Sequence, residues 1–152
     1  LCVRCPSVDH ISVLIKHGKC CPCKLCPACD VSLCKLKGCR SIFILTVINS
    51  SLLKAAIFAA DANWGRILCA IGYAEGDFDI SKVEVVLSSS KGSVKVCENG
   101  AGVDFSEDEA FKILSEDEIV IRIDMHDGAD KSVAWGCDLT YDYVKINGDY
   151  RT

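Results

Sequence analysis

Apolar residues at helical spacing predict four helices after residue 48. The clearest pattern places Leu52, Leu53, Ala56 and Ile57 on one side of a helix. Ser106 is followed three residues later by Glu109, a capping box that starts another helix. The first expected helix starts at Asn49 or Ser50, and the second covers residues 66–73 and ends at Gly72 or Gly76. The third runs from Ser106 through Leu114, and the fourth runs from a cap at Asp138 to Ile146.

Alternating apolar residues predict four strands between these helices, over residues 82–87, 93–97, 119–125 and 131–135. The second strand is expected to pair with the first. Asp127-Gly128 has turn chemistry, so the fourth strand is expected to form a hairpin with the third. The resulting order of elements predicts an α/β (α+β) fold, a two-layer sandwich with a mainly antiparallel sheet, as a partial domain.

The first 48 residues have a different character. They hold nine of the twelve cysteines and a formal charge of +5, whereas residues 49–152 carry a charge of −9. Apart from Val13–Ile15 and the run after Ser41, neither helical nor strand periodicity is visible, so this part is expected to be irregular. The chain is therefore divided into a cysteine-rich segment of doubtful origin, 1–48, and a folded body, 49–152.

Three hypotheses account for the cysteines of residues 1–48. Cys2-x2-Cys5 followed by Cys20-x2-Cys23 approaches the spacing of a four-thiolate zinc site. A disulfide scaffold is the second hypothesis, although the number of cysteines is odd and no secretion signal is visible. Translation in a wrong reading frame is the third. All three stay open, and no metal ligand is assigned.

Composition excludes several classes of function. The net charge of −4 argues against nucleic acid or a membrane surface as a partner. Ile42–Ile48, the most apolar stretch, is far shorter than the roughly 20 residues that span a membrane.

No catalytic set can be assembled, because His126 has no recognisable nucleophile near it, and Cys69 and Cys137 lie in apolar patterns typical of inert thiols. A chain that begins at Leu1 is expected to be a fragment or a cleavage product.

Two polar residues near the end of the chain are candidates for ligand binding. The side-chain amide of Asn147 offers one acceptor and two donor hydrogens. Thr152 ends the chain with a hydroxyl and a carboxylate, groups suited to hold a zwitterionic amino acid. A solvated polar tail is the alternative interpretation of both residues.

Three long strings of this sequence resemble one family. They are the strings NSSLLKAAIF at residues 49–58, DANWGRIL at 61–68 and AWGCDLTYDYVKINGDYRT at 134–152. All three are similar to the bifunctional glutamate N-acetyltransferase/ornithine acetyltransferase family, at the C-terminal part of its β chain. The resemblance covers residues 49–152 and does not include the cysteine-rich segment.

The resemblance implies an N-acyltransferase of arginine biosynthesis. Such multifunctional enzymes transfer an acetyl group from N-acetylornithine to glutamate, and some accept acetyl-CoA as a co-substrate without any other cofactor. The precursor cleaves itself before a threonine, which becomes the nucleophile and carries the acetyl group. The implied partners are small-molecule substrates and the α chain of the cleaved precursor, in an α2β2 heterotetramer. Asn147 and Thr152 map to two substrate-binding positions of the family.

The sequence departs from the family in one important respect. It has three threonines, Thr46, Thr140 and Thr152, and Thr46 lacks the family's self-cleavage context. The nucleophile is therefore expected upstream of this chain, no catalytic residue is assigned, and the chain by itself is expected to be inactive. Free thiols favour a reducing compartment, the cytoplasm or an organelle matrix in a eukaryote. The alternative function is a zinc-binding module fused to a non-catalytic scaffold.

Overall fold

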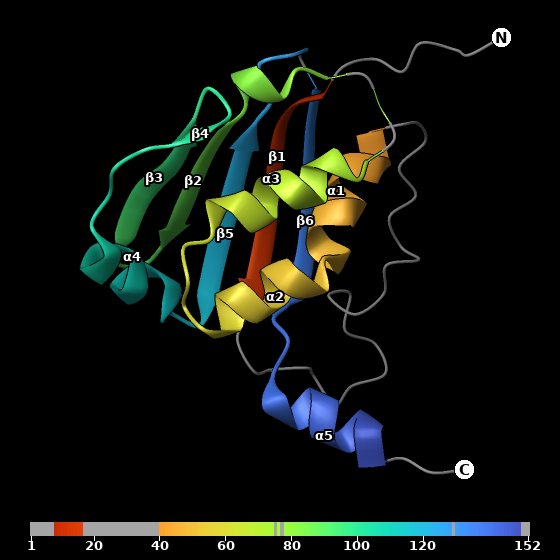
Figure 1. Ribbon diagram of the computed structural model, residues 1–152, viewed down its shortest axis with the longest axis vertical. Helices are drawn as coiled ribbons and strands as arrows, with labels where there is room; N and C mark the ends of the chain where they lie inside the picture. Colours follow the sequence, from red (N-terminus) through yellow and green to blue (C-terminus); the bar gives the residue numbers. More distant parts are fainter. Residues whose placement is uncertain (1–7, 17–39, 75, 77, 129, 150–152) are drawn as a thin grey trace, which may run out of the picture.

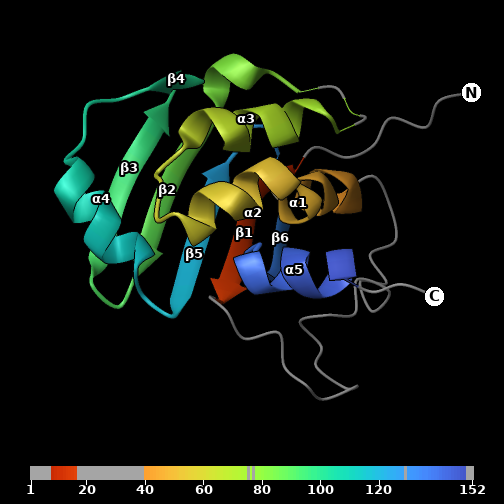
Figure 2. The ribbon, with the colours of Figure 1, turned by 60° about the horizontal axis from the view of Figure 1, so that its bottom comes forward.

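The computed structural model describes residues 8–16, 40–74, 76, 78–128 and 130–149. These form a six-stranded sheet with helices packed on one of its faces (Figures 1 and 2). The helices are α1 (Arg40–Asn49), α2 (Ser51–Phe58), α3 (Trp64–Gly72), α4 (Glu107–Leu114) and α5 (Tyr141–Asp149), with a 3-10 turn η2 (Ile80–Lys82). The strands are β1 (Val8–Lys16), β2 (Glu84–Ser89), β3 (Gly92–Glu98), β4 (Ala101–Gly102), β5 (Glu118–Asp124) and β6 (Asp130–Cys137).

The sheet has the strand order β4-β3-β2-β5-β1-β6 and is mainly antiparallel, as expected. Only the β1–β6 pair among the described strands is parallel. Alternate residues of each strand point toward the helices, which explains why Ile119, Ile121 and Ile123 of β5 are fully buried. The two-layer α/β sandwich predicted from the element order is therefore confirmed.

Helices α2 and α4 start at the capping residues that the sequence indicated. Ser50 Oγ accepts a hydrogen bond from the Leu53 backbone N–H at 3.3 Å, and Ser106 Oγ accepts one from Glu109 N–H at 3.3 Å. Each bond satisfies a donor of the first helical turn that has no partner within the helix. Strand β3 pairs with β2, as predicted for the strands over residues 93–97 and 82–87, and Leu87 lies opposite Val94.

The expected hairpin between β5 and β6 is wrong, because β1 lies between these two strands. Val13 of β1 faces Ile121 of β5 on one side and Ala134 of β6 on the other. Val13 and Ile15 are fully buried in this position. A strand from the start of the chain therefore separates two strands that follow each other in sequence.

The irregularity expected of residues 1–48 does not hold for β1 and α1. These are the two places where the sequence showed periodicity, Val13–Ile15 and the run after Ser41. Phe43, Ile44, Val47 and Ile48 of α1 are buried in the same core as the rest of the molecule. Gly136 of β6 makes room for α1, since a Cβ there would lie 2.6 Å from Cγ1 of Ile48.

The last helix has a different cap from the one predicted. Thr140 Oγ1 accepts the hydrogen bond from Tyr143 N–H at 3.1 Å, so α5 begins at Tyr141 and not directly after Asp138. Asp138 is instead buried, at 5% exposure, between β6 and this helix. No residue of α5 is buried, and the helix lies beyond the end of the sheet (Figure 1). Among the helices of the described residues, none has the length and the apolar character that a membrane span requires.

Candidate functional site

Asn147 lies on the exposed surface of α5. Its side-chain Nδ2 donates a hydrogen bond to the backbone carbonyl of Tyr143 at 2.8 Å, one helical turn earlier. The amide therefore supports its own helix in this structure, and a ligand would have to replace this bond or use the other amide atoms. Thr152 lies outside the described residues, so a joint site of Asn147 and Thr152 stays a prediction.

A cavity of about 300 Å³ lies where the start of α2 meets the link between β6 and α5. Its lining combines the Lys54 side chain, several hydroxyl and amide groups, and the carboxylate of Asp138; the full set is Asn49, Ser51, Lys54, Cys137, Asp138, Leu139, Thr140 and Tyr143. The backbone N–H of Leu139 donates to the carbonyl of Lys54 at 3.4 Å, which joins the two walls. Opposite charges and hydroxyls suit a small polar molecule, but Asn147 does not line this cavity.

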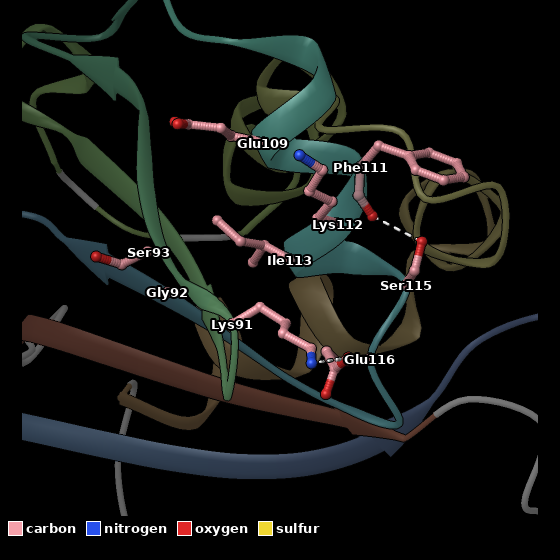
Figure 3. Close-up of a pocket in the computed structure, with 9 residues that line it drawn as sticks. All are labelled: Lys91, Gly92, Ser93, Glu109, Phe111, Lys112, Ile113, Ser115 and Glu116. Carbon is pink, nitrogen blue, oxygen red and sulfur yellow. Dashed lines mark hydrogen bonds and ion pairs between the residues drawn. The ribbon is translucent and has the colours of Figure 1, made fainter.

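A second, more open groove of about 760 Å³ lies between α4 and the turn that joins β2 to β3 (Figure 3). Its charged groups face each other, with Lys91 Nζ 3.8 Å from Glu116 Oε1. Ser115 Oγ donates to the backbone carbonyl of Phe111 at 2.7 Å. The groove holds no pair of nucleophile and base among its lining residues. Glu116 and Asp117 form the bend between α4 and β5.

His126 belongs to a surface charge network and not to a catalytic set. Its Nε2 lies 3.2 Å from Glu84 Oε1, and its Nδ1 lies 3.6 Å from Asp124 Oδ1. Lys95 joins the same network, with Nζ 2.7 Å from Glu98 Oε1 and 3.2 Å from Glu84 Oε2. The hydrogen bonds to Glu98 and Glu84 raise the pKa of Lys95. Because these side chains are exposed or only half-buried at the surface, the network contributes little stability.

The string at residues 61–68 has a structural role in the connection of α2 to α3. Asn63 Oδ1 caps α3 by accepting from the Arg66 backbone N–H at 3.1 Å, while Asn63 Nδ2 donates to Asp61 Oδ2 at 3.0 Å. Arg66 Nη1 donates to the backbone carbonyl of Leu52 at 2.9 Å. These contacts show that the side chains of Asn63 and Arg66 hold the α2–α3 connection together.

The three described thiols have different environments. Cys97 is buried, its Sγ donates to the backbone carbonyl of Val83 at 3.6 Å, and burial raises the pKa of its thiol. Cys137 is half-buried, whereas Cys69 is exposed, so the apolar setting expected of Cys69 is wrong. No group of three potential metal ligands occurs in the residues that the structure describes. The nine cysteines of residues 1–39 lie outside the described residues, so the zinc hypothesis stays untested.

Comparison with known proteins finds relatives of a single family in sequence and in structure. The ArgJ family profile matches residues 34–152. The "Arginine biosynthesis bifunctional protein ArgJ" of Caldanaerobacter subterraneus subsp. tengcongensis is 58% identical over 106 residues, 70% of this chain and 26% of the relative. The Thermotoga neapolitana protein of the same name is 51% identical over 106 residues, 70% of this chain and 27% of that protein. A crystal structure of the Bacillus halodurans ArgJ protein superposes with a TM-score of 0.68 at 31% identity, covering 93% of this chain and 58% of that one.

The two-layer α/β body thus resembles, in fold and in sequence, proteins named for arginine biosynthesis. The chain belongs to the ArgJ family. It spans about a quarter of the length of the curated relatives that it matches. The family match begins at residue 34 and includes α1, so the expectation that the resemblance starts at Asn49 is wrong.

Proposed function

We propose that residues 49–152 form the C-terminal part of the β chain of a glutamate N-acetyltransferase/ornithine acetyltransferase. The observation that carries this proposal is the 58% identity over 106 residues with a relative named as an arginine biosynthesis bifunctional protein. The complete enzyme transfers an acetyl group from N-acetylornithine to glutamate through an acetyl-threonine intermediate. Acetyl-CoA is a possible co-substrate, and no other cofactor is proposed.

The positions of the described threonines support the proposal that this chain is inactive by itself. Thr46 lies inside α1, where its hydroxyl donates to the backbone carbonyl of Phe43 at 2.8 Å. Thr140 caps α5 through its hydroxyl. Both have their backbone nitrogens in peptide bonds, whereas the proposed nucleophile uses a free terminal amine as its base. The nucleophile and the oxyanion hole therefore come from the part of the enzyme that precedes this chain.

The proposed partners are the rest of the β chain and the α chain of the self-cleaved precursor, assembled as an α2β2 heterotetramer. The proposed compartment is a reducing one, the bacterial cytoplasm or an organelle matrix. The exposed thiol of Cys69 is compatible with such a compartment, because an exposed free thiol is chemically stable where thiols are kept reduced.

Asn147 and Thr152 are proposed to hold the amino-acid part of the substrate. The exposed position of Asn147 on α5 supports this role, because the side chain is available to a neighbouring part of the complete enzyme. Phe58 and Tyr141 pack edge to face with ring centroids 5.1 Å apart, and this contact joins the start of α5 to α2. The helix that carries Asn147 is therefore attached to the folded body at one end.

Two assays test the proposal. The purified 152-residue chain is incubated with N-acetylornithine and glutamate, and no ornithine is expected; ornithine production would overturn the proposed inactivity. A chimaera is then made in which residues 49–152 replace the matching segment of the Caldanaerobacter relative. In this chimaera Asn147→Ala should raise KM for N-acetylornithine about tenfold, as expected for one lost hydrogen bond of about 1.4 kcal/mol.

The matched control is Lys145→Ala, which changes another exposed residue of α5 that has no proposed role. Its KM should stay within about twofold of the unmodified chimaera. An Asn147→Ala chimaera with unchanged KM would remove Asn147 from the substrate site. Equal effects of the two substitutions would show that α5 was disturbed as a whole.

A further inference from the structure

A ring contact at the first turn of α5 joins this helix to the folded body. All residues of α5, Tyr141–Asp149, are exposed, and the helix lies beyond the end of the sheet (Figure 1). The ring of Tyr141, the first residue of α5, packs edge to face on the ring of Phe58, the last residue of α2. The ring centroids are 5.1 Å apart and the ring planes meet at 88°. Because the residues of α5 are exposed, burial along the helix does not fix its direction, and contacts at its start have to do so.

Two hydrogen bonds at the same junction do not set the angle between α5 and α2. The backbone N–H of Leu139 donates to the carbonyl of Lys54 at 3.4 Å, but Leu139 lies before the helix. Thr140 Oγ1 accepts from Tyr143 N–H at 3.1 Å, within the first turn of α5 itself. The cavity of about 300 Å³ that Lys54 and Tyr143 both line leaves unfilled space at this junction. The ring contact, by contrast, joins a side chain of α5 directly to α2 and resists a change of this angle.

The direction of α5 decides where Asn147 lies. Asn147 follows Tyr141 by six residues, so it lies about 9 Å further along the helix axis at a rise of 1.5 Å per residue. Its Nδ2 donates to the Tyr143 carbonyl at 2.8 Å, so the side chain moves together with the helix. A tilt of about 20° at Tyr141 displaces Asn147 by about 3 Å, which is enough to break a hydrogen bond to a ligand.

We propose that Tyr141 is a positioning residue, which holds α5 against Phe58 and so places Asn147 at the substrate. This inference rests on the proposed substrate-binding role of Asn147. Tyr141 acts through Asn147 and not by contact with the substrate. Loss of an edge-to-face aromatic pair should raise KM for N-acetylornithine about fivefold, the factor that corresponds to about 1 kcal/mol.

The test uses the chimaera that carries residues 49–152 in the Caldanaerobacter relative. Tyr141→Ala should raise KM about fivefold and leave kcat within about twofold, whereas Tyr141→Phe keeps the ring and should leave KM unchanged. Alanine favours a helix at least as well as tyrosine, so Tyr141→Ala removes the contact and keeps α5 helical. Tyr141→Ala added to Asn147→Ala should raise KM no further, because the group that Tyr141 positions is then missing.

The matched control is Tyr73→Ala, because Tyr73 at the end of α3 is 78% exposed and Tyr141 is 80% exposed. This control should leave KM unchanged. A lower kcat with unchanged KM in Tyr141→Ala would show a merely structural role and overturn the proposal. A further rise of KM in the double variant overturns it as well.

The single variants separate this inference from the proposed function. If Asn147→Ala raises KM and Tyr141→Ala does not, the positioning role fails and the substrate role of Asn147 stands. If Asn147→Ala leaves KM unchanged, the substrate role fails and the positioning role falls with it.

The ring contact is also tested without any activity, by NMR of the 152-residue chain with labelled phenylalanine and tyrosine. The ring protons of Tyr141 should show nuclear Overhauser effects to those of Phe58, and Phe58→Ala should shift the Tyr141 ring resonances. Tyr141 resonances that show no such effect and do not respond to Phe58→Ala overturn the proposal.

Discussion

The contact between Gly136 and Ile48 provides a sharp test of how the first part of the chain joins the folded body. Gly136 lies on β6 and Ile48 lies on α1. A Cβ added at position 136 would be 2.6 Å from Cγ1 and 2.8 Å from Cδ1 of Ile48, distances that force a side chain or the backbone to shift. Overpacking of this kind costs about 2 kcal/mol of unfolding free energy, so Gly136→Ala should destabilise the chain by about that amount.

The same geometry predicts that a second substitution removes most of this cost. Ile48 is 8% exposed, so Ile48→Ala by itself should cost about 3 kcal/mol through lost burial and a cavity. That cavity is where the methyl group introduced by Gly136→Ala would lie. The double variant should therefore cost about 3 kcal/mol and not the sum of about 5, which is a coupling of about 2 kcal/mol.

The assay is urea unfolding of the four chains, followed by far-ultraviolet circular dichroism with a reducing agent present. Free energies that add within about 0.5 kcal/mol would show that the two residues do not touch. In that case α1 would not pack on β6, and the placement of α1 in the core would be refuted. Gly65→Ala is a useful control, because a Cβ there has only an ordinary contact of 3.6 Å with Asn63 Oδ1.

Three further predictions test separate parts of the structure. Ser106→Ala should lower the free energy of unfolding by about 1 kcal/mol through loss of the α4 cap, whereas Ser106→Asp should retain it; equal losses would exclude the cap. Burial raises the pKa of the Cys97 thiol, so alkylation at about pH 8 should modify the exposed Cys69 first, as mapped by mass spectrometry. Prompt modification of Cys97 would contradict its burial. Hydrogen bonds from the Ser81 hydroxyl and backbone N–H lower the pKa of the Asp79 carboxyl. In an NMR titration, Ser81→Ala should raise the pKa of Asp79 toward the ordinary value. An unchanged pKa of Asp79 would exclude the Ser81 hydroxyl as a cause.

Local chemistry explains what the sequence predicted well. Ser50 and Ser106 cap helices because a hydroxyl at that position satisfies a backbone N–H of the first turn. The alternation of Ile119, Ile121 and Ile123 identified a strand with one buried face, since side chains of a strand alternate between faces. Both signals depend on neighbouring residues and need no knowledge of the rest of the chain.

Non-local pairing explains what the sequence did not predict. A turn at Asp127-Gly128 made a β5–β6 hairpin the simplest arrangement, but β1 inserts between the strands from more than a hundred residues away. The apolar run that indicates β1 is only Val13–Ile15, within a segment that is otherwise rich in cysteine. The cavity that includes Lys54 was also missed, because its walls come from α2 and the β6–α5 link and meet only in the folded chain.

The chemistry of Asn147 and Thr152 made them candidates, the resemblance gave them a substrate-binding role, and the structure adds the position of Asn147. Asn147 is exposed on α5, with its amide bonded to the Tyr143 carbonyl. No spacing or periodicity rule predicts that a surface amide binds substrate, because a solvated amide has the same local pattern. This assignment therefore depends on experiments with a complete enzyme.

The turnover of the chimaera with the Caldanaerobacter relative tests the central claim most directly. Ornithine release from N-acetylornithine and glutamate is measured for the chimaera that carries residues 49–152 and for the unmodified relative. If these residues form the C-terminal part of an acetyltransferase β chain, the chimaera should retain activity within about tenfold of the relative, equivalent to about 1.4 kcal/mol of transition-state stabilisation. A folded, self-cleaved chimaera without ornithine release would contradict the claim.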